Sequence, residues 1–260
     1  MLAQPQDFFK AKDLLLAWTG RNIRGRYQQS ALGWLWAIFQ PVATVAIFTI
    51  IFTQFVPVDT GNTPYVIFSY VAMVSWTFLA SSLTDMVSSI VSNMDLVKKI
   101  YFPREALPVA AMLARSMDFG IAAVLVVLLL IVYQAPFFPM GWLLLPGVLA
   151  IQVMLILGVG FTGAALNVFY RDVQSLLALG IQLWFYASPI IYPITLVPER
   201  FRTLYFLNPM AGVITAYRDI LIEGKLPGSY LIPSALVSVL LFIFGYWFFK
   251  KVEFRFADIV

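Results

Sequence analysis

The distribution of charged residues along this chain constrains its fold more than any other feature. Five long intervals contain no Asp, Glu, Lys or Arg, namely residues 27–58, 60–84, 119–170, 173–198 and 226–249. A helix needs about 20 apolar residues to cross the hydrocarbon core of a bilayer. Charged residues make up only 12% of the chain and hydrophobic residues 61%, whereas about 25% of a soluble domain is charged. The chain therefore belongs in a membrane.

Six membrane-spanning helices account for these intervals. The longest interval has room for two spans, and Pro136, Pro139 and Gly141 divide it near its middle. The predicted fold class is an all-α integral membrane protein, with residues 1–260 forming a single transmembrane domain. We expect the spans near residues 35–56, 65–88, 107–133, 142–168, 175–193 and 229–249.

The segment that precedes the first span, residues 1–33, has the pattern of an amphipathic helix. Leu2, Phe9, Leu16 and Ile23 recur every seven residues. Such a stripe is typical of a helix that lies in the membrane interface. A cytoplasmic helix docked on the bundle is the alternative.

Lysine and arginine residues predict which side of the bundle faces the cytoplasm. With six spans, the N-terminal segment, the second connection, the fourth connection and the C-terminal tail fall on one side. Their basic residues are Lys10, Lys12, Arg21, Arg24, Arg26, Lys98, Lys99, Arg104, Arg171, Lys250, Lys251 and Arg255. The first and third connections contain neither residue type. Both termini are therefore expected in the cytoplasm.

The fifth connection departs from this pattern, because its basic residues would lie on the opposite side, namely Arg200, Arg202, Arg218 and Lys225. Nearby acidic residues almost balance their charge. The apolar middle of the connection, PMAGVITAYRDILI, predicts a short re-entrant or interfacial helix. A seventh span there would instead place the C-terminus outside.

The composition argues against an enzyme. The chain has no cysteine and no histidine, which removes thiolate metal sites and the commonest general base. Gly158, Gly160 and Gly163 spell G-x-G-x-x-G, but this dinucleotide fingerprint needs a strand before it and a helix after it. Here it lies inside a predicted span, where small residues let helices approach closely. No G-x-x-x-x-G-K-[ST] phosphate loop occurs. We predict no catalytic residue and no metal site.

Several polar residues at the cytoplasmic ends of the spans are candidates for an entrance or gate. They are Arg26, Tyr27, Arg115, Asp118, Arg171 and Asp172. Charges inside a membrane are costly and suggest function, yet Arg115 and Asp118 are three residues apart and can simply pair with each other. Arg26 and Tyr27 suit the headgroup boundary. For Arg171 and Asp172, a plain membrane anchor is the alternative.

The segment NMDLVKKIYFPRE, residues 93–105, lies on the predicted cytoplasmic side. A solvated loop is the simple interpretation. Its two aromatic residues and two lysines at helical spacing also suit docking into a groove of a soluble partner.

Aromatic residues and prolines crowd the outer half of the fifth predicted span. Pro189 and Pro193 break that helix, and broken backbone at membrane depth survives only where it is buried or lines a cavity. An interfacial aromatic belt is one interpretation. The other is a lining on which sugar rings stack.

Five stretches, in their order and spacing, resemble the permease subunit of type-2 ABC exporters. They are RYQQSALGWLWAIFQP, KKIYFPREALPV, NVFYRDV, SPIIYP and FLNPM. The likeness runs over residues 10–255 and is to the branch that exports O-antigen and other cell-surface polysaccharides. It implies a membrane subunit of an ATP-driven exporter that moves a lipid-linked polysaccharide across the bacterial inner membrane.

The resemblance also implies partners. The chain would form a homodimer and bind two copies of a separate ATPase subunit, which would hold ATP and Mg²⁺, so that this chain would carry no cofactor. Its other contacts would be the lipid-linked glycan and membrane lipid, with no nucleic acid. Residues 92–103 would match the coupling helix that docks on the ATPase, with Asp95, Lys98, Lys99, Tyr101 and Phe102 as its contacts.

In the same family pattern, the first and fifth spans of both copies would line the channel. The expected aromatic contacts are Trp34, Trp36, Phe39, Trp184, Tyr186 and Tyr192. The first two are two residues apart, about 200° around a helix, so they cannot share a face. The N-terminal helix would frame the cytoplasmic mouth, and residues 194–224 would form short re-entrant helices outside.

Three other functions compete with this interpretation. A membrane glycosyltransferase or phosphatase would need clustered carboxylates, usually with a metal, whereas the acids here are scattered. A proton- or sodium-driven transporter would need ionisable groups near mid-membrane. A teichoic-acid, small-molecule or drug exporter remains an alternative within the same permease family.

Overall fold

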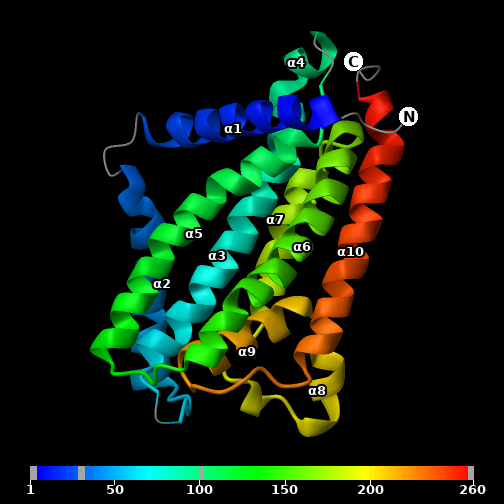
Figure 1. Ribbon diagram of the computed structural model, residues 1–260. Coiled ribbons are helices and arrows are strands. Elements are labelled where there is room, and N and C mark those ends of the chain that lie inside the picture. Colours follow the sequence, from blue (N-terminus) through cyan, green and yellow to red (C-terminus); the bar gives the residue numbers. More distant parts are fainter. Residues whose placement is uncertain (1–4, 29–32, 62, 100–101, 257–260) are drawn as a thin grey trace.

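The computed structural model describes residues 5–28, 33–61, 63–99 and 102–256, and its regular structure there is entirely helical (Figure 1). Within these residues, five helical stretches are long and apolar enough to cross a membrane. They are Gly33–Phe55 (η1 Gly33–Leu35, α2 Trp36–Ile50 and the π-turn η2 Ile51–Phe55), α3 Tyr65–Ser89, α5 Ala106–Val132, α6 Pro139–Phe169, and Leu231–Arg255 (α10 Leu231–Val252 and η5 Glu253–Arg255). The all-α membrane class is confirmed.

A sixth apolar helix, α7 (Val173–Tyr186), has only 14 residues. At 1.5 Å per residue it is about 21 Å long, short of a hydrocarbon core of about 30 Å. It ends before Pro189 and continues as an unwound segment. The described residues therefore contain five helical stretches that are long and apolar enough to span a membrane and one shorter apolar helix, where the sequence predicts six spans.

The remaining helices mark the two ends of the bundle (Figure 1). α1 (Pro5–Tyr27) lies across one end, beside η3 (Val91–Asn93), α4 (Met94–Lys99) and η5, and we call this the α1 end. η4 (Ile194–Leu196), α8 (Glu199–Tyr205) and α9 (Pro209–Leu221) lie at the other end, called the α8 end. α9 begins with a favourable cap, because the Asn208 side chain accepts from the backbone N–H of Met210 and proline occupies the first helical position.

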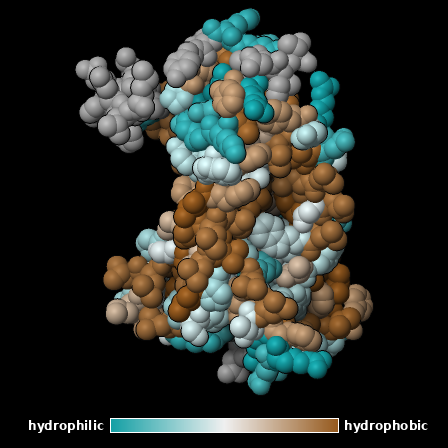
Figure 2. Space-filling model, turned by 90° about the vertical axis from the view of Figure 1, so that its right-hand side faces the viewer, coloured by the Kyte–Doolittle hydropathy of each residue, from teal (hydrophilic) through white to brown (hydrophobic). Residues whose placement is uncertain are grey.

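α3 is the central helix of the bundle. Most of its side chains are buried, from Tyr65 to Ser89, and it packs against α2, α5, α6, α7 and α9. By contrast, α10 leaves Leu236, Leu240 and Ile243 exposed. In Figure 2 an apolar band separates two hydrophilic ends of the molecule. This surface suits contact with lipid, because a bilayer core solvates apolar side chains and no polar ones.

The glycines of the G-x-G-x-x-G sequence lie in the middle of α6 at its contacts with α3 and α10. A Cβ atom added to Gly158 would lie 2.5 Å from the backbone carbonyl carbon of Leu241 in α10. One added to Gly163 would lie 2.5 Å from a methyl group of Val87 in α3. The helix-packing interpretation of these glycines is therefore confirmed.

Aromatic and charged contacts join the segment after α4 to the end of α10. Phe256 is fully buried among apolar side chains, and Arg104 donates a hydrogen bond to the backbone oxygen of Glu253. The Lys250 ammonium lies 2.9 Å from both Glu105 and Glu253. α4 is thus attached to the bundle through α3 on one side and α10 on the other.

Candidate functional site

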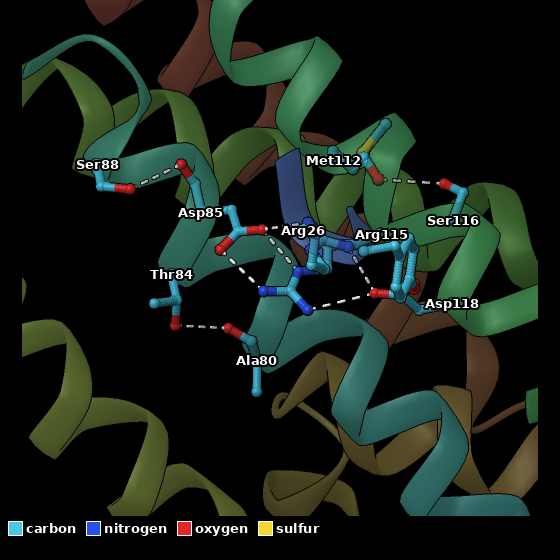
Figure 3. Close-up of polar contacts among 10 residues, drawn as sticks. Arg26, Ala80, Thr84, Asp85, Ser88, Met112, Arg115, Ser116 and Asp118 are labelled. Carbon is cyan, nitrogen blue, oxygen red and sulfur yellow. Dashed lines mark hydrogen bonds and ion pairs between the residues drawn. The ribbon is translucent and has the colours of Figure 1, made fainter. Parts of the chain in front are cut away.

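Three helices meet in a charged cluster at the α1 end. Arg26, in the last turn of α1, donates to Asp118 of α5 at 2.6 Å and to Asp85 of α3 at 2.8 Å. Arg115 of α5 donates to both oxygens of Asp85, at 2.6 and 3.0 Å, and to Asp118 at 3.2 Å. Figure 3 shows the two guanidinium groups between the two carboxylates. We call Arg26, Asp85, Arg115 and Asp118 the four-charge cluster.

The cluster balances two positive charges against two negative ones. Its side chains are 17–27% exposed, so water screens them only in part. Removing one partner from such a half-buried network leaves an uncompensated charge, which costs more than the intact pair contributes. The cluster can therefore hold α1, α3 and α5 in one arrangement, and any relative movement of these helices must break some of its bonds.

Tyr27 extends the cluster by one neutral group. Its hydroxyl donates a hydrogen bond to Asp118. Burial raises the pKa of Tyr27 above its usual value, and the hydrogen bond and negative charge of Asp118 raise it further. The phenol therefore stays protonated at neutral pH and remains a donor.

A cavity of about 260 Å³ adjoins the cluster. Arg26, Tyr27, Arg115 and Asp118 line it on the side of the cluster, and Trp36 is among the other lining residues. The cavity connects the polar end of α1 with the apolar surface of α2. It is the place where a polar group could enter the bundle beside the first long helix.

The structure brings together four of the six predicted gate residues and adds one that the sequence interpretation missed. Arg115 and Asp118 do pair with each other, yet each also bonds outside that pair. The missed residue is Asp85, whose side chain is only 27% exposed and bonds to two arginines. Its place inside the predicted span 65–88, directly after the charge-free interval 60–84, was the one available signal.

Arg171 and Asp172 are not part of the cluster. They lie in the turn between α6 and α7, and both are exposed. Within the described part of the chain, no salt bridge joins them to each other or to the cluster.

The predicted partner-docking residues lie at the α1 end. Asp95, Lys98 and Lys99 are exposed on α4, which projects from the bundle in Figure 1. Phe102 is half-buried against the aromatic core near the end of α10. Tyr101 lies outside the described residues. Arg21 of α1 donates to Asn93, just before α4, at 3.2 Å.

The predicted aromatic channel residues occupy two different settings. On α2 and the turn before it, Trp34, Trp36 and Phe39 are 53%, 49% and 55% exposed. Of these, only Trp36 also lines the cavity beside the cluster. The centres of the Trp36 and Phe39 rings lie 5.6 Å apart, and the rings meet edge to face.

The aromatic residues of α7 and its unwound end are less uniform. Tyr186 is 57% exposed. Trp184 is half-buried, packs edge-on against Trp76 of α3 and donates to Asn208 at 2.7 Å. Tyr192 bonds to the hydroxyl of Tyr205 in α8 at 3.0 Å. The channel residues expected on the fifth span thus divide between an exposed face and contacts inside the bundle.

Comparison with known proteins gives a consistent result. The model of the ABC-2 type transporter family matches residues 13–222. The O-antigen export system permease protein RfbA of Klebsiella pneumoniae is 31% identical over 249 residues, 95% of each chain. RfbA of Myxococcus xanthus is 31% identical over 245 residues, 93% of each chain. The polysialic acid transport protein KpsM of Escherichia coli is 23% identical over 227 residues, 84% of this chain and 86% of KpsM.

These likenesses extend over the helices that carry the four-charge cluster, the α4 projection and the α7 break. The family model covers well over half of the chain, and a relative at 31% identity matches 95% of it. The chain therefore belongs to the ABC-2 type transporter family of membrane permeases.

Proposed function

We propose that this chain is the membrane subunit of an ATP-driven exporter that moves a lipid-linked, O-antigen-like polysaccharide across the bacterial inner membrane. The observation that carries the proposal is the 31% identity to O-antigen export permeases over 95% of both chains. ATP and Mg²⁺ bind to a separate ATPase subunit. The exporter contains two copies of each subunit, and the polysaccharide passes between the two permeases.

In this proposal the α1 end faces the cytoplasm. The basic residues of α4, of the segment after it and of the end of α10 gather there, for example Lys99, Arg104 and Lys251. Lysine and arginine are enriched on the cytoplasmic side of membrane proteins. α7 and its unwound extension together form the sixth span, because broken backbone is acceptable at membrane depth where it is buried.

α4 is the coupling helix in this proposal. Its exposed residues, Asp95, Lys98 and Lys99, dock on the ATPase. A displacement of α4 is transmitted to α1 through the hydrogen bond from Arg21 to Asn93. It is transmitted to α10 through the hydrogen bond from Arg104 to the backbone oxygen of Glu253. α1 then acts on α3 and α5 through the four-charge cluster.

The four-charge cluster is the latch of the cytoplasmic entrance, meaning the set of bonds that keeps the entrance in one state. With its bonds intact, α1 is held across the ends of α3 and α5. When the ATPase closes, the displacement of α1 exchanges these bonds and changes the opening beside Trp36. Such a transition between two packed arrangements is the usual form of gating in transport proteins. None of the proposed steps requires chemistry on the substrate.

Surface polysaccharide in a deletion strain tests the proposal. The strain should lose its long-chain surface glycan and accumulate lipid-linked glycan inside. The wild-type chain, supplied together with its ATPase, should restore the glycan. Normal surface glycan in the deletion strain would reject the proposed substrate.

A second measurement tests the division of labour between the subunits. The purified chain alone should show no ATP hydrolysis above background, and its complex with a co-expressed ATPase subunit should hydrolyse ATP. Strong hydrolysis by the chain alone would contradict the proposal. Restoration of teichoic-acid or drug export without any effect on polysaccharide would instead favour another exporter of the same family.

A further inference from the structure

α7 stops abruptly at the α8 end, and the backbone after it is unwound. Residues 187–192 form turns and bends with no regular helix. Such an end leaves carbonyl groups without helical partners, and each must find a donor if it is buried. Ser188 and Ile190 are fully buried, so water cannot satisfy this backbone.

Arg218 of α9 supplies two of the missing donors. Its Nη1 donates to the carbonyl of Pro189 at 2.6 Å, and its Nη2 donates to that of Ile190 at 2.8 Å. Its Nε donates to the carbonyl of Phe68 in the first turn of α3 at 3.1 Å. The same guanidinium lies 3.5 Å from the centre of the Phe68 ring. One side chain thus joins α9, α3 and the unwound segment.

This arginine is unusual because it is buried without an acidic partner. It is 5% exposed, and within the described residues no carboxylate lies within 4.0 Å of it. The neighbouring Asp219 instead accepts from Tyr230 at 2.5 Å and faces Lys225 at 3.4 Å. A buried charge is costly unless hydrogen bonds satisfy it, so the three carbonyls are the reason that Arg218 is tolerated at this position.

Two further side chains hold the same segment. Asn208, at the start of α9, donates to the carbonyl of Ala187 at 3.0 Å and accepts from Trp184. Tyr65, at the start of α3, donates to the carbonyl of Ile191 at 2.8 Å. Both ends of α9 and the start of α3 therefore hold successive residues of the unwound segment.

The helix that leads into this segment is much less buried. The structure describes every residue of α7, and none of them is buried. Its other end carries the exposed turn with Arg171 and Asp172. Burial therefore changes sharply from α7 to residues 188–190, which is the pattern expected where a mobile helix meets a fixed anchor.

We propose that Arg218, assisted by Tyr65 and Asn208, is a positioning residue that fixes residues 187–191 as the stationary side of a hinge for α7. The inference rests on the proposed function, because a hinge is needed only if α7 moves while polymer passes beside it. In each transport cycle α7 turns about this segment, while the segment stays with α9 and α3. The fork of Arg218 suits the role, since one planar guanidinium bonds to carbonyls of two separate chain segments.

Cysteine labelling tests whether Arg218 holds the stationary side of the hinge, and the natural chain contains no cysteine that would interfere. Ile190→Cys puts a thiol on the fully buried segment and leaves the backbone carbonyl in place. The full-length chain in membranes is treated with a membrane-impermeant maleimide. The thiol should react slowly in the otherwise unchanged chain, and about tenfold or more faster with Arg218→Met, because bonds to a charged donor are lost. Tyr65→Phe should give a smaller acceleration, and Arg218→Lys an intermediate one.

Ala164→Cys is the matched control, since Ala164 is equally buried but lies in α6 near the α1 end. Its labelling should not change with any of these substitutions. An equal acceleration at both thiols would mean that Arg218 only stabilises the whole fold, and would overturn the proposal. Unchanged labelling at position 190 would overturn it as well. The labelling rates do not depend on transport, so a failure of polysaccharide export in the unmodified chain would count against the proposed function alone.

Discussion

The guanidinium of Arg115 bonds to both carboxylate oxygens of Asp85, at 2.6 and 3.0 Å. This two-bond geometry joins α5 to α3, while Arg26 brings α1 to the same carboxylate. Bidentate arginine–carboxylate pairs are among the stronger and more directional contacts in proteins. Asp85 and Asp118 both bond to the two arginines, but only Asp85 accepts two bonds from the Arg115 guanidinium.

Asp85→Asn is expected to abolish most polysaccharide export. It leaves two arginines facing one carboxylate, and should lower the free energy of unfolding by about 1–2 kcal/mol, a value reduced for the partial exposure of the cluster. Surface-glycan blots and thermal unfolding in detergent measure the two effects. Thr84→Ala is the control, because the adjacent Thr84 is exposed and bonds only to the backbone of Ala80 in its own helix (Figure 3). Export at the wild-type level in Asp85→Asn would show that the cluster is not the latch.

Exchanging Asp85 and Arg115 in the double variant Asp85→Arg, Arg115→Asp should recover part of the stability that either single change removes. The pair restores charge balance, although its geometry differs. A double-mutant cycle on thermal unfolding measures the coupling, which we expect to be about 1 kcal/mol or more for two side chains in direct contact. If the two single substitutions changed the free energy of unfolding additively in the double variant, a direct interaction between Asp85 and Arg115 would be contradicted.

Charge reversal on α4 should weaken assembly with the ATPase. Lys98→Glu combined with Lys99→Glu changes two exposed side chains, so the permease itself should unfold at an unchanged temperature. The apparent Kd for the ATPase should rise about tenfold at low salt, and less at high salt, because salt screens exposed charges. The matched control reverses Lys251 and Arg255, which are also exposed at the α1 end. Equal weakening by both double variants would mean that α4 is not the specific docking element.

Trp36 and Trp34 should differ in their importance for export. Trp36 lines the cavity beside Arg26 and Tyr27, where a sugar ring could stack on its indole. We expect such a contact to contribute as much as a pair of aromatic side chains, about 0.5–1.5 kcal/mol. Trp36→Ala should therefore reduce the rate of export several-fold, and Trp34→Ala should reduce it less. Pulse-labelled glycan reaching the cell surface measures both rates. The opposite ranking would move the entrance to the other face of the helix.

Gly158→Val should destabilise the bundle without touching the cluster. The added side chain would meet the backbone of α10, and overpacking of this kind costs about 1–3 kcal/mol or more. Gly147→Ala in the same helix is the control, because nothing lies within 4 Å of a Cβ atom added there. Thermal unfolding measured by the loss of monodisperse protein in detergent compares the two. An unfolding temperature for Gly158→Val equal to that of Gly147→Ala would contradict close helix packing at this glycine.

Much of the candidate site could be predicted because its signals are local. Arg115 and Asp118 are three residues apart in an apolar helix, so their pairing follows from helix geometry alone. The contribution of Asp85 could not be predicted in the same way. It bonds to residues 30 and 59 positions away, and whether it faces water or α5 depends on the rotation of α3 about its axis.

The aromatic residues show the same limit. The sequence places Trp36, Trp184 and Tyr186 in apolar intervals and predicts that the prolines after α7 break the helix. It does not say that the indole of Trp184 turns into the bundle and bonds to Asn208. A side chain's direction is decided by which neighbour fills the space beside it, and the neighbours of α7 come from α3 and from the segment around α9.

The sequence by itself determined the membrane class, the apolar intervals and the clustering of basic residues at one set of connections, because each of these depends on composition within a short window. Only the tertiary structure decided that four charges from three helices neutralise one another, and that a buried arginine satisfies the carbonyls of a broken helix. The physical reason is the same in both cases. A buried charge must find its partner wherever the fold places one, and that place is set by packing between helices that are distant in the sequence.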